Sequence, residues 1–289
     1  MRNSILSHAA IGGQGIGLWA DGLQTYAQSR PQNDVARIKT DRTGAIGGVD
    51  FGFGPFRAGV NGGYSRDNVQ LLDRASSAKV KTTSAGASIG WAPAPTGYSV
   101  QVGGTNAWHD IDTARVVGIT GLAGTPVSQY QARTSQLFAE AGHTAQYGDL
   151  RFNPFVRYAH VWTDVDGTTE TGGPASLSTA AQKLETSFAT AGLRISGTSA
   201  LSPSTSLQPH ANFDFTHAWG DRAGIVAAAF NGASTAFGVT AARIGTDTFG
   251  ADIGVDVVSG NMRFGLAGIG SVSSEWNDYG AKASLPFRF

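Results

Sequence analysis

Histidines and carboxylates are the residues of this chain best suited to acid–base chemistry. The histidines are His8, His109, His143, His160, His210 and His217. A serine hydrolase needs a serine, a histidine and an acid within reach, and the G-x-S-x-G elbow found in many hydrolases is absent. His210 and Asp214 do share one face of an extended stretch. Alternating polar residues produce such pairs without a catalytic role, so we do not expect an enzyme.

Metal, phosphate and nucleic-acid chemistry have little support in the sequence. There is no cysteine, the histidines lack zinc-ligand spacing, and no phosphate-binding loop occurs. The 21 basic and 21 acidic residues give a formal net charge of zero, which offers no electrostatic case for nucleic acid. We therefore expect no cofactor, no metal site and no nucleic-acid partner.

Most of the notable charges fall on one register of alternating stretches, whereas the other register is almost uncharged. The residues that we expect to line an enclosed interior are Asp50, Arg57, Glu140, Arg157, Arg194, Asp214, Asp252 and Asp256. Side chains of a strand alternate between its two faces, so this pattern gives each strand one polar and one apolar face. An arginine facing lipid near the midplane costs about 2–4 kcal/mol, so the segregation indicates that the apolar faces meet lipid.

The elements that must carry these residues are about twelve strands. We expect them near residues 16–30, 45–53, 56–65, 79–91, 98–109, 128–146, 150–163, 183–196, 208–216, 248–257, 262–273 and 277–289. The connections between them are expected to alternate between long and short, with long polar loops at 66–78, 112–127 and 164–182. Membrane barrels combine an even strand number with short turns at one end and longer loops at the other.

The composition agrees with a barrel and not with helical spans. Charged residues make up 15% of the chain, below the roughly 25% of soluble domains, and there are 40 glycines. The longest uncharged run, 223–242, is too rich in glycine and polar residues to be a good membrane helix. An open sheet edge in hydrocarbon would leave backbone groups unpaired, so the strands must close. The prediction is an all-β fold, a twelve-stranded antiparallel transmembrane barrel.

Two domains are expected: an N-terminal stub at 1–12, read as the possible end of a helix, and the barrel at 13–289. No signal peptide opens the sequence, so an exported protein would be represented here by part of its precursor. The six tryptophans are expected near strand ends, in the aromatic belts of the two interfaces. They are Trp19, Trp91, Trp108, Trp162, Trp219 and Trp276.

Several motifs, taken in order, resemble the C-terminal translocator domain of autotransporters, the type V secretion family. The resemblance runs from about Gly15 to Phe289. It is carried by GLWADG at 17–22, GYSR at 63–66, AWHDIDTAR at 107–115, ARTSQLFAE at 132–140, NPF at 153–155, AGLR at 191–194 and LPFRF at 285–289. No single motif is diagnostic, but their order and spacing together are specific.

The resemblance implies a monomeric barrel in the outer membrane of a Gram-negative bacterium. It also implies a helix inside the lumen that leads to an N-terminal passenger at the cell surface. Phe289 is similar to the terminal residue that the barrel assembly machinery reads.

Some members of that family cut themselves between helix and barrel, using interior acids and an asparagine of the helix. Asn3 precedes the first expected strand, and the candidate acids are Asp21, Asp50, Glu140, Asp214, Asp252 and Asp256. We expect instead that these acids solvate the lumen and pair with Arg57, Arg157 and Arg194, because ion-pair networks often imitate active sites.

The expected function is therefore translocation and surface anchoring of an N-terminal passenger. An outer-membrane diffusion pore without a passenger is the alternative, and a soluble β protein is a third interpretation. The sequence predicts neither the passenger's identity nor whether the lumen conducts.

Overall fold

The computed structural model of this chain describes residues 15–31 and 35–289. The expected stub at 1–12 lies outside this range, as do Asn3 and His8. The strands of the main sheet are β1 (Gly15–Ser29), β2 (Ile38–Phe53), β3 (Phe56–Leu71), β4 (Ser76–Trp91), β5 (Gly97–Arg115), β6 (Val127–Tyr147), β7 (Leu150–Val165), β10 (Gln182–Gly197), β11 (Ser199–Ser202), β12 (Thr205–Gly220), β15 (Asp247–Ser259), β16 (Met262–Ser273) and β17 (Trp276–Arg288).

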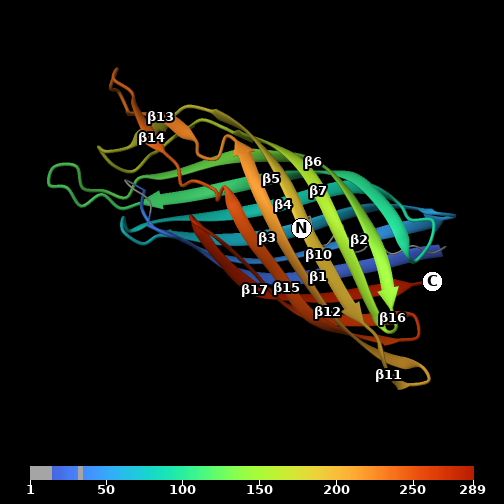
Figure 1. Cartoon of the computed structure of the whole chain (residues 1–289). Helices are drawn as coiled ribbons and strands as arrows, with labels where there is room; N and C mark the ends of the chain where they lie inside the picture. The colour runs from blue at the N-terminus through green and yellow to red at the C-terminus, as the bar shows by residue number, and fades with distance from the viewer. Residues whose placement is uncertain (1–14, 32–34) are drawn as a thin grey trace.

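These strands form a closed antiparallel barrel (Figure 1). Every long strand pairs with its neighbour in sequence, β1 pairs with β17, and β10 pairs with β12, so that no long strand keeps a free edge. The short β11 only extends the turn before β12. Twelve strands therefore make up the wall, as predicted.

Alternation along each strand explains why the sheet closes with its polar face inside. On β6 and β7, Leu137 and Val156 are 59% and 60% exposed, whereas Glu140 and Arg157 are 6% and 7% exposed. Residues paired across two strands point to the same face, so one register buries a continuous polar surface. Closure also leaves no long strand with an open edge, as a lipid environment requires.

Tight turns connect the strands at the end that carries the C terminus (Figure 1). The connections are 54–55, 92–96, 148–149, 198–204 and 260–261. Gly54, Gly148 and Gly260 have φ of 57°, 58° and 55° in three of these turns. Such left-handed conformations suit two-residue hairpins and cost glycine nothing, so glycine at these positions fixes the register of each hairpin.

At the opposite end the predicted strict alternation of long and short connections is wrong in two places. The connections 30–37, 116–126, 166–181 and 221–246 are long, but 72–75 and 274–275 are short. The predicted loop 66–78 is mostly strand, since β3 and β4 stay paired up to Leu71 and Ser76. Beyond the membrane both faces of a strand meet water, so the apolar half of the alternation disappears and the strand reads as a loop.

Two of the long connections join into a second sheet above the barrel. It contains β8 (Thr168–Thr169), β9 (Leu177–Thr179), β13 (Ile225–Phe230) and β14 (Phe237–Thr240), in the order β14-β13-β9-β8. Figure 1 shows β13 and β14 at the end opposite the tight turns. Arg115 at the top of β5 donates two hydrogen bonds to Glu170 and one to the carbonyl of Ala175, which ties the sheet to the wall.

A small apolar cluster lies inside the barrel. It comprises Trp19, Ile46, Phe138 and Ala159, with Phe188 packed against it. Trp19 is 6% exposed, so its predicted place in an aromatic belt is wrong: it falls on the inward register of β1. Trp91, Trp108 and Trp219 are exposed on the outer wall, where a belt would lie. Within the described ranges, no helix is long and apolar enough to cross a membrane.

Candidate functional site

The inward face of β6, β7 and β10 carries a charge cluster centred on one carboxylate. Arg157 donates to Glu140 from Nε at 2.8 Å and from a terminal nitrogen at 2.6 Å. Arg194 donates to both oxygens of the same carboxylate at 2.8 and 2.9 Å. Glu140 and Arg157 are cross-strand partners, so the register itself places their side chains together. We call Glu140, Arg157 and Arg194 the Glu140 cluster.

Arg194 is held in the Glu140 cluster by two further neighbours. It donates to the side-chain oxygen of Asn153 at 3.0 Å, and its guanidinium carbon lies 3.9 Å from the centre of the Phe155 ring. A Cβ on Gly192 would come within 2.5 Å of that ring. Glycine at 192 thus lets the Phe155 ring lie flat against the wall. The face of the ring then makes a cation–π contact with the Arg194 guanidinium.

A second cluster lies on β12, β15, β16 and β17. Lys282 donates to Asp252 at 2.9 Å, and the His210 ring lies 3.5 Å from both Asp252 and Asp256. Arg263 lies 3.9 Å from Asp256 and donates to Gln208 at 2.6 Å. We call this set, with Asp252 at its centre, the Asp252 cluster. Its central pair, Asp252 and Lys282, is more exposed than Glu140 and Arg157, whereas Arg194 is more exposed than either pair.

The remaining predicted interior residues, Asp50, Arg57 and Asp214, also fall on the inward register. Asp50 and Arg57 are buried on β2 and β3, and a Cβ on Gly17 would lie within 4 Å of both side chains. Asp214 is half-buried and accepts from Asn212 at 3.0 Å. Asp21 is also fully buried on this register. Whether these residues line a conducting pore stays a prediction.

His210 was considered as a partner of Asp214, but in the structure its ring contacts Asp252 and Asp256 instead. Sequence reasoning also missed the roles of Lys282, Arg263 and Asn153. Lys282 and Asn153 already stood on the polar registers of their expected strands, so the alternation could have found them. It could not have shown which carboxylate each would reach.

A serine, a histidine and a carboxylate do meet on the outer wall. Ser187 Oγ lies 2.7 Å from His160 Nδ1, and His160 Nε2 lies 3.9 Å from Glu185. Ser187 is almost completely buried, and β10 is paired on both sides, which commits the backbone N–H groups that an oxyanion site would need. This arrangement therefore lacks an essential part of a hydrolase. Among the residues described, no group of three metal-ligating side chains is present either.

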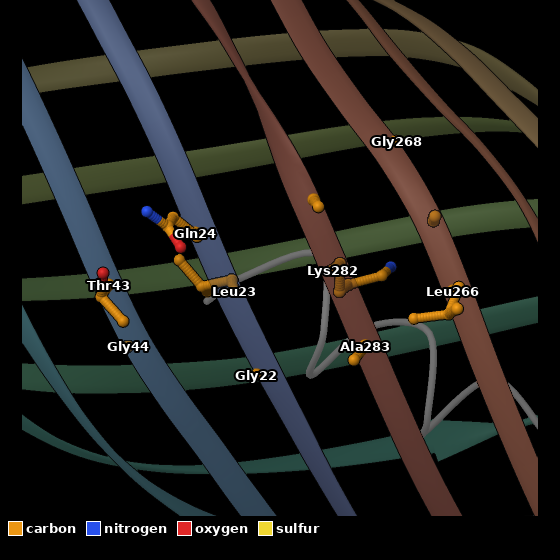
Figure 2. A pocket seen from close by; sticks show the side chains of 11 residues that line it. Gly22, Leu23, Gln24, Thr43, Gly44, Leu266, Gly268, Lys282 and Ala283 are labelled. Atoms are coloured by element: carbon orange, nitrogen blue, oxygen red, sulfur yellow. The ribbon is translucent and has the colours of Figure 1, made fainter.

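A shallow groove crosses the wall where the first and last strands meet. Figure 2 shows a groove that crosses β2, β1, β17 and β16. Gly22, Ala281, Ala283 and Gly268 occupy neighbouring positions of one face there, as the strand register shows. Leu266 and Lys282 mark one side of the groove, and Gln24 and Thr43 mark the other. Thirteen residue pairs nevertheless join β1 to β17, so the barrel is sealed along this line.

Phe289, the predicted assembly signal, follows β17 at the tight-turn end of the β1–β17 pairing. Its N–H donates to the carbonyl of Ile16 at 3.0 Å, and its ring contacts that of Phe287 edge-on. The ring is 69% exposed, so it remains available to another molecule. Recognition by assembly machinery stays a prediction.

Comparisons with known proteins agree with this architecture. The family model for the autotransporter beta-domain matches residues 18–269. Two proteins of Serratia marcescens, each named extracellular serine protease, are 28% and 26% identical to the chain over 94% of its length. The chain spans about a quarter (26%) of the length of these curated relatives.

Solved structures resemble the fold as well. The translocator domain of the autotransporter NalP from Neisseria meningitidis gives a TM-score of 0.76 at 17% identity, covering 99% of this chain and 93% of that one. The beta domain of the Bordetella autotransporter BrkA gives 0.72 at 15% identity, covering 96% and 100%. The transport unit of AIDA-I from Escherichia coli gives 0.61 at 12% identity, covering 96% and 91%.

Proposed function

The chain belongs to the autotransporter beta-domain family and is an outer-membrane translocator domain, and from this premise we propose that it exports and anchors a passenger joined to its N-terminal side. The observation that carries the proposal is the closed twelve-stranded wall, with its charges inside and its apolar side chains outside. Such a wall holds a polar path through the membrane of a Gram-negative cell and meets lipid without an open edge.

The barrel contributes shelter and anchorage to this process and has no catalytic part in it. The Glu140 cluster consists of side chains that satisfy one another, and the outer-wall serine lacks oxyanion donors. The protease name of the Serratia relatives belongs to proteins about four times as long, so it is not carried over to this barrel. Direction of transport would come from folding of the passenger outside the cell.

Three partners follow from the proposal: the passenger with its lumen segment, the lipid bilayer, and the barrel assembly machinery that would read Phe289. The barrel acts as a monomer, because all long strands are already paired within one chain. Cleavage of the passenger and its continued attachment are both compatible with the interior acids.

A reporter fused ahead of residue 1, behind a signal peptide, tests the proposal in a Gram-negative host. The intact chain should make the reporter accessible to protease added to whole cells. A matched chain lacking residues 276–288 cannot close the barrel and should leave the reporter inside. A folded barrel in the outer membrane with a periplasmic reporter would contradict the proposal.

A passive diffusion pore is the second candidate. It would conduct continuously in planar bilayers whether or not an upstream segment is attached. The translocator proposal instead expects conductance to fall when the upstream segment is present, because that segment would occupy the lumen.

A further inference from the structure

Three basic side chains gather on the outer wall at one height of β3 and β4. Arg66 and Lys81 are direct cross-strand partners, and Lys79 is one outward position further along β4, opposite Asn68. All three are exposed. We call Arg66, Lys79 and Lys81 the basic patch. Like charges placed directly opposite each other destabilise a strand pair, so this arrangement is costly unless an anion lies between them.

Among the described residues, the cations of the basic patch make no close contact with a carboxylate. No ion pair within 4.0 Å in the part of the chain that the structure describes includes any of its three members. Asp110 and Asp112 stand across from Lys81 and Lys79 on β5, but Asp110 already accepts from Gln131 at 3.0 Å. Arg66 donates only its Nε, to the Tyr64 hydroxyl at 2.8 Å, which leaves its terminal nitrogens open.

Some cations elsewhere on the outer wall, at the same end, do face a carboxylate. Lys183 lies 3.6 Å from Asp164, and His217 lies 2.7 Å from Asp247. Arg133 donates to the neutral side chain of Asn106 at 3.1 Å. The basic patch differs from the first two in having no carboxylate of the described ranges within 4.0 Å.

The height of the basic patch matches the outer edge of the hydrocarbon layer. Outward residues of β3 run from Phe56 at the tight turn to Tyr64, and Arg66 follows. Ten residues of a strand tilted by about 40° climb about 25 Å, the height of the apolar band of such barrels. Arg66 and Lys81 consequently reach the level of lipid headgroups, while the side chains below them meet acyl chains.

The wall beneath the basic patch is smooth. Tyr64 and Trp108 are exposed in the row below Arg66 and Lys81. Gly62 and Ala85 form the next row, with Asn106 beside them on β5, and Val60, Ala87 and Gly104 form the row below. Two aromatic rings above a run of small residues leave room for a straight hydrocarbon chain against the sheet, with its headgroup beside the cations.

We propose that the basic patch and the smooth wall beneath it bind a phosphorylated glycolipid of the outer leaflet, its phosphates on Arg66, Lys79 and Lys81 and its acyl chains on β3 to β5. The occupant is a lipid because the cations lie at headgroup height directly above an apolar surface. Phosphate suits the site because it accepts several hydrogen bonds from two lysines and an arginine at once. The proposal needs only insertion in the outer membrane, so it stands or falls separately from passenger export.

Native mass spectrometry of the purified barrel in detergent, titrated with lipid A carrying two phosphates, tests the proposal. The wild-type barrel should retain one lipid A. The double variant K79Q/K81Q should bind it about thirtyfold more weakly, since each lysine near an anionic lipid surface strengthens binding about fivefold. The matched control is Lys183→Gln, which removes an outward lysine that already faces a carboxylate, and it should bind like wild type.

A second arm keeps the test decisive if the double variant folds poorly. The wild-type barrel is titrated with the same lipid after enzymatic removal of its phosphates, and retention should fall to the level of the double variant. Equal retention of the two lipids would overturn the proposal. So would equal binding by wild type and K79Q/K81Q, or an equal loss in Lys183→Gln.

Discussion

The two interior charge clusters differ in how completely their members satisfy one another. In the Glu140 cluster one carboxylate accepts four hydrogen bonds of 2.6–2.9 Å from two arginines. In the Asp252 cluster the central carboxylate accepts one hydrogen bond of 2.9 Å, from Lys282, and the other charge contacts measure 3.5–3.9 Å. Glu140 and Arg157 are buried, whereas Asp252 and Lys282 keep some contact with water.

This difference separates two uses of polar residues inside a barrel. Tightly paired buried charges fix the mutual position of β6, β7 and β10, because the loss of one partner would leave the other charges buried without a counter-charge. Looser, hydrated charges keep the opposite side of the lumen polar at little cost to stability. A segment passing through the lumen would therefore find a rigid wall on one side and an adaptable one on the other.

Removing the central carboxylate should have the largest effect. Glu140→Gln keeps the shape of the side chain but leaves Arg157 and Arg194 without their counter-charge. We expect a loss of about 3–5 kcal/mol in the free energy of unfolding, the usual cost of breaking a buried pair. Equilibrium urea unfolding in lipid vesicles, followed by tryptophan fluorescence, measures it.

The control for this variant is Glu185→Gln on the outer wall, which should change stability by less than about 0.5 kcal/mol. If the two variants unfold alike, the Glu140 cluster does not hold the wall together.

The glycine beneath the Phe155 ring should matter next. Gly192→Ala places a methyl group within 2.5 Å of the ring and should cost about 1–3 kcal/mol, as overpacking does. Gly62→Ala is the matched control, because its nearest neighbour would be a carbonyl oxygen at 3.6 Å. Both variants can be compared by the temperature at which the folded barrel loses its compact gel mobility. Equal shifts would mean that Phe155 can move aside.

A smaller effect is expected for the Asp252 cluster. Asp252→Asn removes the partner of Lys282 and one partner of His210. Partial hydration of these side chains, and the longer distances between them, should limit the loss of stability to about 1 kcal/mol. Urea unfolding beside Glu140→Gln gives the ranking directly. A loss as large as that of Glu140→Gln would erase the distinction between the clusters.

The smallest effect belongs to a pair outside the membrane, Arg37 and Asp73, which serves as the exposed reference. Hydrogen bonds from Arg37 lower the pKa of Asp73 below its ordinary value. The folded-state pKa is thus below the unfolded one. The stabilisation is then complete above the unfolded pKa of about 3.9 and is lost as the pH falls through the folded value.

Hydrogen exchange of the 72–75 connection tests this pair. Its protection should decrease below about pH 4 in wild type and be insensitive to pH there in Asp73→Asn. An unchanged acid response in the variant would show that another group titrates.

The sequence was most informative where a strand crosses lipid. Expected strands at 150–163, 248–257 and 262–273 lie within two residues of β7, β15 and β16, because lipid on one side and polar lumen on the other enforce alternation. Above the membrane this constraint ends. The upper end of β3 (66–71), the first residues of β4 (76–78) and the strands β8 and β9 lack a clear alternation and were read as loops, and 220–244 was read as loop plus strand extensions.

The sequence predicted which residues face the interior, but not which of them contact one another. Glu140, Arg157 and Arg194 were expected inside, and pairing of acids with arginines was expected in general terms. Which cation reaches which carboxylate depends on side-chain reach across three strands, which alternation does not encode. Trp19 shows the opposite failure, since aromatic character suggested a belt while its register placed it inside.

The uneven lengths of the outer connections give the mouth of the barrel a high side and a low side. From β5 round to β15 the rim is raised by the connections 116–126, 166–181 and 221–246 and by the sheet built on them. From β16 round to β4 two of the three connections, 274–275 and 72–75, are short turns, and 30–37 is shorter than any connection on the high side. An emerging polypeptide would therefore meet fewer protein loops over the low side, close to the headgroups of the surrounding bilayer.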